Sequence, residues 1–416
     1  MDVPDLSPLR ERFPSLTRMG PDGRPCVFAD APGGSQVPDT VITAMRDYLL
    51  HSNANTHGVF SASEQTDALI AAARRAASDL VGSDPDEIAF GPNATTLLFS
   101  ISRSFARTLR PGDEILLTRL DHDANIRPWL MAADDAGATV RWVDVRPGDV
   151  TLDLDSLEAA LSDRTRLVAC TLASNAVGTI TPALDIARRV HDAGALIAFD
   201  AVHLAQHQSI DVRAIGADIL VCSPYKFFGP HMGLLFGRRE LLAEWTPYKV
   251  RPASDDVPER WETGTLNHEG LAGTIASIDY LADVGRAFGA AGGEPRRESV
   301  RAGFRAIRDY ESGLAVRFLE GLEEGRGVSL YGISDPARVG ERTPTFALRI
   351  GDQHPVETAK ILGHRGIFTW DGHYYAVELF DRLGLNDTGG ALRIGFCHYS
   401  TREEVDRVLS ELASLA

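Results

Sequence analysis

Short runs of apolar residues alternate along this chain with stretches that have helical spacing. Seven runs predict β-strands, at 87–91, 114–118, 139–145, 165–174, 196–200, 218–223 and 233–237. Several of them contain unbroken apolar segments, such as LVAC and LIAF, a pattern typical of strands that are buried on both faces of a sheet. Strands of this kind that alternate with helices predict an α/β fold with a mostly parallel sheet.

The pattern changes after about residue 270. Helical stretches at 271–288 and 299–323 flank a Gly-rich break at 289–295. They are followed by strands at 328–333, 345–350 and 391–400 and by a final helix at 401–415. We therefore expect a large domain over 31–270 and a small C-terminal α+β domain over 271–416, with an N-terminal segment, 1–30, packed against the small domain.

Composition excludes several classes of protein. Lys and Arg number 42 against 58 Asp and Glu, a net charge of −16, and no basic run is present, so nucleic acid is not an expected partner. No stretch approaches the roughly 20 apolar residues that a membrane span needs, and the N-terminus does not resemble a signal peptide. The four cysteines show no CxxC spacing, which predicts neither disulfides nor a metal site and favours the cytoplasm.

Polar residues follow several predicted strands, at the sheet edge where ligands bind in open parallel sheets. FGPNATT (90–96) enters a helix, whose N-terminal amides suit an anion such as phosphate; in the alternative interpretation, Thr95 only caps that helix. Asp200 ends an apolar strand, where a buried carboxylate needs a cationic partner. Lys226 follows the next strand, between aromatic residues in SPYKFFGP.

A phosphate-binding helix start, a strand-end aspartate and an enclosed lysine are together the parts of a pyridoxal 5'-phosphate site. The lysine forms a Schiff base with the cofactor aldehyde, and the aspartate keeps the pyridine nitrogen protonated so that the ring withdraws electrons. The amine must be neutral to attack, and burial lowers its pKa toward that state.

The motifs that carry these residues also resemble those of a known family. NANTHG, DHDANIRPW, SNAVGT, DAVH, SPYKFFGP and ETGTLN occur in that order. Over nearly its whole length the chain resembles the class V aminotransferase group, in particular cysteine desulfurases of the SufS/CsdA type and their relatives. The resemblance implies the type I fold of pyridoxal 5'-phosphate enzymes, that cofactor, an amino-acid substrate and a homodimer with shared active sites.

The resemblance further implies roles for single residues. It implies that Lys226 is the Schiff-base lysine, that Asp200 pairs with the ring nitrogen and that His122 stacks on the ring. Contacts to the ring 3-hydroxyl are implied for Asn175 and His203. Contacts to the phosphate are implied for Ala94, Thr95, Ser223, Tyr225 and, from the neighbouring protomer, Thr265.

Substrate contacts are implied in the same way. Arg393 resembles the clamp for the substrate α-carboxylate, a bidentate task that suits guanidinium, although a structural ion pair is its alternative. Gly33, Gly34 and Asn55 would border the substrate.

The chain departs from the desulfurases at one position. Those enzymes carry a mobile loop whose cysteine takes sulfur from the substrate as a persulfide. In TWDGHYYAVELF (369–380), His373 matches the family pattern and Tyr375 stands in place of that cysteine. A phenol cannot accept sulfane sulfur, so we expect neither a persulfide relay nor a sulfur-acceptor protein. Cys397, which strand alternation places on the same face as Arg393, is interpreted as a core residue.

The reaction we expect is therefore a β-elimination that cleaves the C–S bond of cysteine or a cysteine S-conjugate. Lys226 would remove the α-proton, and Tyr374, Tyr375 or His373 would protonate the leaving thiolate. Trp370 and the tyrosines would form an apolar wall for the S-substituent. Transamination, epimerisation and decarboxylation by related enzymes stay open as alternatives, as does a non-catalytic scaffold, against which the retained lysine, aspartate and arginine argue.

Overall fold

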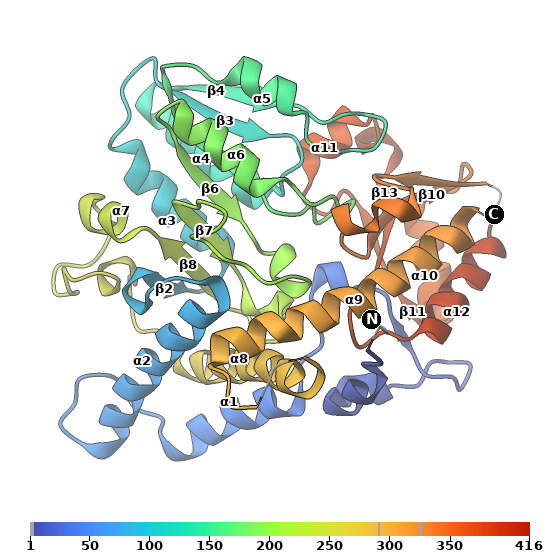
Figure 1. The fold of residues 1–416 in the computed structure, drawn as a ribbon, viewed down its shortest axis with the longest axis horizontal. Helices are drawn as coiled ribbons and strands as arrows, with labels where there is room; N and C mark the ends of the chain where they lie inside the picture. The colour runs from blue at the N-terminus through green and yellow to red at the C-terminus, as the bar shows by residue number, and fades with distance from the viewer. Residues whose placement is uncertain (1–3, 290–291, 324–326) are drawn as a thin grey trace.

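The computed structural model describes residues 4–289, 292–323 and 327–416. Within these ranges the largest sheet has seven strands in the order β2-β8-β7-β6-β5-β3-β4 (Figure 1). The strands are β2 (Ile88–Gly91), β3 (Glu114–Thr118), β4 (Thr139–Val143), β5 (Thr165–Thr171), β6 (Leu196–Asp200), β7 (Ile219–Cys222) and β8 (Gly233–Gly237). Strands β4, β3, β5, β6 and β7 are parallel, and β8 and β2 join antiparallel. The predicted α/β fold with a mostly parallel sheet is confirmed.

Helices cover the sheet and extend away from it. They are α1 (Asp39–His51), α2 (Ser61–Val81), α3 (Ala94–Ala106), α4 (Arg127–Ala136), α5 (Leu154–Ala160), α6 (Ala183–Asp192), α7 (Arg239–Glu244), α8 (His268–Phe288), α9 (Arg296–Glu323), α10 (Pro355–His364), α11 (Val377–Arg382) and α12 (Arg402–Ala413).

The sheet separates two apolar cores, which explains its unbroken apolar strands. In β3, Ile115 and Leu117 pack with residues of α3 and α4, whereas Leu116 between them packs on the opposite face with residues of α2 and α6. Successive side chains of a strand point to opposite faces, so a sheet covered on both faces needs apolar residues at every position.

The C-terminal part contains a second, antiparallel sheet in the order β12-β13-β10-β9. Its strands are β12 (Trp370–Gly372), β13 (Ala391–Gly395), β10 (Thr345–Ile350) and β9 (Val328–Tyr331). The N-terminal segment attaches to this part: β1 (Val27–Phe28) pairs in parallel with β11 (Ile367–Phe368), and the Arg10 guanidinium lies 2.9 Å from the Glu404 carboxylate. Residues 1–3 of that segment and 290–291 of the Gly-rich break lie outside the described ranges.

Helix α8 begins close to the predicted domain boundary at residue 270. It packs against α1 and α2 as well as against α9 (Figure 1), so it connects the helices beside the large sheet with the C-terminal part. The division at residues 30 and 270 stays a prediction.

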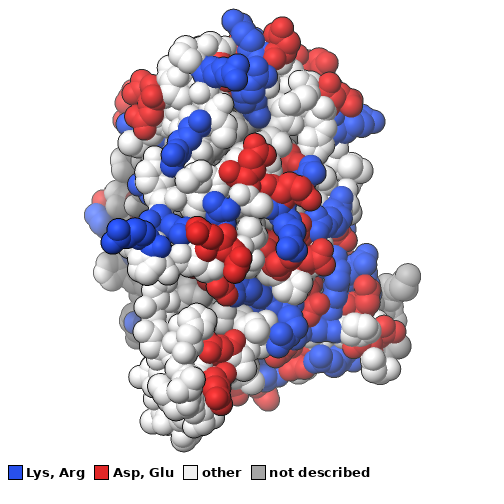
Figure 2. All heavy atoms as spheres, turned by 90° about the vertical axis from the view of Figure 1, so that its left-hand side faces the viewer, with Lys and Arg blue, Asp and Glu red and all other residues white. Residues whose placement is uncertain are grey.

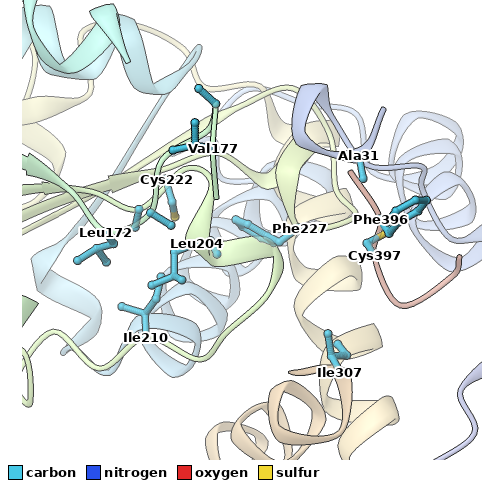
Figure 3. Packing of buried hydrophobic residues seen from close by; sticks show 14 of the residues in the cluster. Ala31, Leu172, Val177, Leu204, Ile210, Cys222, Phe227, Ile307, Phe396 and Cys397 are labelled. Carbon is cyan, nitrogen blue, oxygen red and sulfur yellow. The ribbon is translucent and has the colours of Figure 1, made fainter. Parts of the chain in front are cut away.

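The strand predicted over 391–400 ends at Gly395, so that prediction is wrong for its second half. The Ser400 amide donates to the Cys397 carbonyl, which closes a turn and leaves Cys397 outside the strand that carries Arg393. Cys397 is fully buried and lies with Phe396 and Phe227 in one core (Figure 3). Burial raises the pKa of its thiol well above the ordinary value, which suits a core residue.

No helix of the described residues is long and apolar enough to cross a membrane. Figure 2 shows basic and acidic side chains interspersed over the face that it presents.

Candidate active site

A cavity of about 580 Å³ opens at the carboxyl ends of the parallel strands, where the loops after β3, β5, β6 and β7 meet residues of the C-terminal sheet. Most of the predicted site residues line it. They are Gly33, Ala94, Thr95, His122, Asn175, Asp200, His203, Ser223, Tyr225, Lys226, Trp370, His373, Tyr374, Tyr375 and Arg393.

Three predicted site residues lie outside this cavity. Asn55 and Thr265 are exposed on the surface. Gly34 lines a neighbouring cavity of about 520 Å³, which Gly33 and Trp370 share. A β-carbon on Gly33 would lie 2.3 Å from the Trp370 indole nitrogen, so this glycine allows the indole to close one side of the site.

Lys226 ends a single 3-10 turn, Pro224–Lys226, that follows β7 directly. Its ammonium group donates to the Pro32 carbonyl, and only 6% of the residue is exposed. Burial first, and then the charge of Arg393, lower the pKa of Lys226 to about 7, although Asp200 and Asp30 act in the opposite direction. A large fraction of this amine is therefore neutral near pH 7, as a nucleophile or base requires.

Asp200 is the last residue of β6 and is buried. Its Oδ1 accepts a hydrogen bond from the Val202 amide, at 2.8 Å. Burial raises the pKa of Asp200 to about 6, and the charge of Lys226 partly opposes that effect. A cationic group in the cavity, such as a protonated ring nitrogen, would keep this carboxyl ionised.

The start of α3 forms the anion-binding end of the cavity. Asn93, not Thr95, caps the helix, because its side chain accepts from the Thr96 amide at 2.8 Å. The alternative interpretation of Thr95 as the cap is therefore wrong, and its hydroxyl lies exposed at the helix start. The Ala94 amide faces the Ser223 hydroxyl at 3.3 Å. Amides and hydroxyls at the N-terminus of a 13-residue helix suit a phosphate group.

His122 lies just after β3, and its Nδ1 accepts from the Ala124 amide at 3.0 Å. Burial, with smaller effects of Lys226 and Arg393, lowers the pKa of His122 to about 4, so the ring is neutral and carries its proton on Nε2. The ring stacks against Tyr375, with centroids 5.4 Å apart and planes inclined by 26°.

Three buried polar atoms of cavity residues lack a hydrogen-bond partner among the described residues: Oδ1 of Asn175, Nδ1 of His203 and Nε of Arg393. The Nε2 of His203 lies 3.0 Å from the Thr345 hydroxyl. Because buried polar atoms in proteins nearly always have a partner, these atoms indicate a polar ligand. They stand beside Asp200, Lys226 and the start of α3, so the residues present fit the ring, the aldehyde and the phosphate of pyridoxal 5'-phosphate.

Arg393 reaches the cavity from β13. Its guanidinium donates to the Asn175 carbonyl at 2.8 Å and lies 4.4 Å from the centre of the Tyr374 ring. Burial lowers the pKa of Arg393 to about 10, which leaves it cationic at neutral pH. Its contacts are thus to a carbonyl and a ring, and its charge remains available for a ligand carboxylate.

The segment that carries Tyr374 and Tyr375 is held in place from two sides. Tyr374 and Tyr375 have φ values of 51° and 62°, a left-handed conformation that is uncommon for residues other than glycine. The Asn175 side chain donates to the Tyr374 carbonyl at 2.9 Å, and the Asp123 amide donates to the Tyr375 carbonyl at 2.7 Å. The Tyr374 hydroxyl donates to the Ala391 carbonyl, whereas Tyr375 is 67% exposed.

Asp30 is a residue of the site that sequence reasoning missed. It is largely buried, and burial raises its pKa to about 6 while the charges of Arg393 and Lys226 oppose that effect. Its Oδ1 has no partner in the described part of the chain. A signal was present, because Asp30 ends the short apolar run CVFA just as Asp200 ends β6. Nothing in that signal placed it beside Lys226, 196 residues further on.

Comparison with known proteins agrees with this geometry. The family model "Aminotransferase class-V" matches residues 27–294 and 297–408. An aminotransferase-like protein, FGM3, of Gibberella zeae is 32% identical over 418 residues, which cover 97% of this chain and 96% of that protein. A cysteine desulfurase of Pectobacterium atrosepticum is 31% identical over 420 residues, with the same coverage of both chains.

Solved structures give the same result. The apo structure of a cysteine desulfurase from Thermococcus onnurineus has a TM-score of 0.87 at 26% identity, covering 100% of this chain and 98% of that one. The cysteine desulfurase CsdA of Escherichia coli shares the fold, with a TM-score of 0.83 at 24% identity and coverage of 100% and 99%.

The chain belongs to the class-V aminotransferase family and resembles its cysteine desulfurases. It has the type I fold of pyridoxal 5'-phosphate enzymes, and it is an enzyme that depends on this cofactor.

Proposed function

We propose that this enzyme cleaves the C–S bond of cysteine or of a cysteine S-conjugate by β-elimination, without a persulfide relay. The proposal rests on Tyr375, a phenol that lines the cavity and that, by the resemblance of its segment to the desulfurase loop, stands in place of the nucleophilic cysteine. The products would be a thiol, or sulfide when the substrate is cysteine, together with pyruvate and ammonia. One water is consumed, and no oxidant or sulfur-acceptor protein is needed.

Binding of the substrate would depend on Arg393, whose guanidinium would pair with the α-carboxylate. Pyridoxal 5'-phosphate, when bound, supplies an aldehyde that condenses with amines and a ring that withdraws electrons from Cα. Asp200 would hold the proton of the ring nitrogen, and the start of α3 would bind the phosphate. Asn175 and His203 would provide their unpartnered buried atoms to the ring hydroxyl.

Removal of the α-proton falls to Lys226, whose pKa of about 7 leaves much of the amine neutral. A base with a pKa near the working pH combines the correct protonation state with useful basicity. The carboxyl groups of Asp200 and Asp30 would stabilise the ammonium that this step creates.

We propose that Tyr375 protonates the leaving sulfur, and the hydrogen bonds of its neighbours support this role. The Tyr374 hydroxyl is engaged with the Ala391 carbonyl, and burial raises its pKa well above the ordinary value. The His373 Nδ1 accepts from the Tyr375 amide at 3.1 Å, which leaves only its Nε2 as a possible donor. The hydroxyl of Tyr375 lies at the rim, where Trp370 would pack against an S-substituent.

A panel of S-alkyl and S-aryl cysteines tests the proposal. The cofactor-loaded enzyme is expected to release pyruvate and a free thiol in equal amounts from at least one member. A keto acid that retains the sulfur would instead indicate transamination. A racemised substrate would indicate epimerisation, and released carbon dioxide would indicate decarboxylation. Protein that never develops the absorbance of a bound cofactor would point to a scaffold.

We also propose a cytoplasmic homodimer in which Thr265 of one protomer reaches the phosphate site of the other. Helix α1 exposes Ile42, Leu49 and Leu50 on one face, and Val59 and Phe60 follow in the next loop. Apolar residues gathered in this way mark association surfaces. The four cysteines are buried and unpaired within the described ranges, which suits a reducing compartment.

A further inference from the structure

A group of buried polar residues lies behind the cofactor cavity, on the side of α9. We call it the His203–Glu311 cluster, and its members are His203, Gln206, His207, Glu311 and His398. Each of them is at most 2% exposed. His203 also lines the cofactor cavity, so the cluster begins at the wall of the active site.

Contacts join three members of this cluster, His203, His207 and Glu311. The rings of His203 and His207 have centroids 5.1 Å apart. The His207 Nδ1 lies 2.7 Å from the Glu311 Oε2, a distance typical of a strong, charge-assisted hydrogen bond. The pKa of the Glu311 carboxyl group is raised above its ordinary value, mainly by burial.

The cluster nevertheless has an unusual number of unsatisfied atoms. Six buried atoms lack a hydrogen-bond partner among the described residues: His203 Nδ1, Gln206 Oε1, Gln206 Nε2, His207 Nε2, Glu311 Oε1 and His398 Nδ1. Buried polar groups that lack a protein partner generally bind internal water.

A small cavity beside the cluster has room for such a water. Its volume is about 10 Å³, close to the roughly 10–15 Å³ that one water needs. His207, Glu311, Thr343 and Arg342 line it on the inside, and Arg308 lines it towards the surface. The Thr343 hydroxyl lies 3.1 Å from the His203 Nε2. Polar atoms therefore continue from the active-site wall to a groove beside α9.

We propose that the His203–Glu311 cluster, with a bound internal water, is a proton relay that connects the cofactor cavity with solvent at the groove beside Arg308. A proton enters at Glu311 and passes through the water, which His207 helps to hold, to the Thr343 hydroxyl, which lies 3.1 Å from the His203 Nε2. It leaves at His203 toward the cavity. One proton enters for each that leaves, so no bond to carbon changes and no redox partner is required. His207 and Glu311 act here as positioning residues, because they act through His203.

The relay would serve any reaction of this cavity that exchanges protons, and its use in C–S cleavage rests on the proposed function. The titratable groups that face Glu311 and His207 are His203, His398 and Cys397. The cations at the small cavity are Arg342 and Arg308.

Two measurements on the ligand-free protein test the relay independently of activity. A crystal structure is expected to show an ordered water between His207, Glu311 and Thr343. Nuclear magnetic resonance of protein labelled with 15N-histidine is expected to show His207 protonated on Nδ1, with a ring N–H that exchanges rapidly with bulk water despite its burial. A dry cavity, or a ring proton that persists for hours in heavy water, would overturn the proposal.

Steady-state kinetics of the enzyme with bound pyridoxal 5'-phosphate provide a second test, in which the variants are Glu311→Gln and His207→Asn. We expect each to lower kcat roughly tenfold at unchanged KM and to alter the solvent isotope effect. The matched control is His191→Asn, because His191 also pairs with a buried carboxylate, that of Asp218 at 2.9 Å, but lies outside the cavity. Variants that keep the wild-type isotope effect would contradict the relay. If the ligand-free protein holds the water and its His207 ring proton exchanges rapidly, but no pyruvate forms, the proposed C–S cleavage is rejected and the relay is retained.

Discussion

At the scale of single residues, the chemistry of the site depends on the environment of one amine. Lys226 is buried, with one cation and two carboxyl groups acting on its charge. Desolvation is the largest of these effects, because an ammonium removed from water loses more free energy than its partners restore. Asp200 and Asp30 limit that effect without cancelling it.

The first prediction concerns the pH dependence and the site of cofactor attachment. Because the pKa of Lys226 is lowered to about 7, the fraction of neutral amine increases as the pH rises through 7 and then levels off. The rate of pyridoxal 5'-phosphate attachment, trapped with borohydride, should follow that curve. An increase that continues to pH 10 would indicate an ordinary lysine.

Mapping the trapped adduct is simple because the chain contains only three lysines. Peptide mass spectrometry should find the reduced adduct on Lys226 and none in Lys226→Met. The exposed Lys360, which pairs with Glu357, provides the control variant Lys360→Met, which should retain the adduct at Lys226.

The second prediction separates the two neighbouring tyrosines. Tyr375→Phe should lower kcat for C–S cleavage roughly 100-fold and leave the free energy of unfolding within about 0.5 kcal/mol, because Tyr375 is exposed. Tyr374→Phe removes a buried hydrogen bond to Ala391 and should reduce stability by about 1 kcal/mol. Steady-state kinetics and urea unfolding of both variants measure these effects. A larger loss of kcat in Tyr374→Phe would reverse the assignment.

At the scale of elements, the loop after β5 carries Asn175 and depends on a buried cation. Arg342 is 4% exposed and donates to the carbonyls of Ile333, Val177 and Thr345. Burial alone lowers its pKa to about 9, so it stays charged at neutral pH. It thereby holds the Asn175 loop against the strands of the C-terminal sheet.

The third prediction concerns the contribution of Arg342 to stability. Arg342→Met should reduce the free energy of unfolding by about 3 kcal/mol, because buried carbonyls would lose their donor. Arg338→Met, four residues earlier, removes two more exposed ion pairs, with Asp149 and Glu341, and should cost no more than about 1 kcal/mol. Urea unfolding of both variants measures the difference. Equal losses of unfolding free energy would show that Arg342 does not hold the Asn175 loop in place.

At the scale of the whole molecule, the exposed apolar face of α1 is the surface through which we expect two protomers to associate. The fourth prediction is that Leu50→Glu dissociates the dimer and lowers activity, because Thr265 would no longer reach the partner's site. Light scattering should give about twice 45.1 kDa for the wild type and the single-chain mass for the variant. Leu184→Glu, on α6 and similarly exposed, should remain dimeric. A wild-type monomer would refute the assembly.

The sequence predicted best those features that depend on residues close together in the chain. The apolar runs located the strands of the large sheet, because a sheet covered on both faces requires them. The residues at the strand ends, among them Asp200 and Lys226, could be assigned to one edge because parallel strands place their carboxyl ends together. Chain order and periodicity were sufficient for both conclusions.

Other features depend on contacts between distant segments, and only the tertiary structure decided them. It placed Asp30 beside Lys226, ended β13 before Cys397 and engaged the Tyr374 hydroxyl while leaving that of Tyr375 at the rim. Periodicity reports which face a residue occupies within its own element. Burial, pKa and the choice of hydrogen-bond partner are set by the other segments that pack against that element, and no local pattern encodes them.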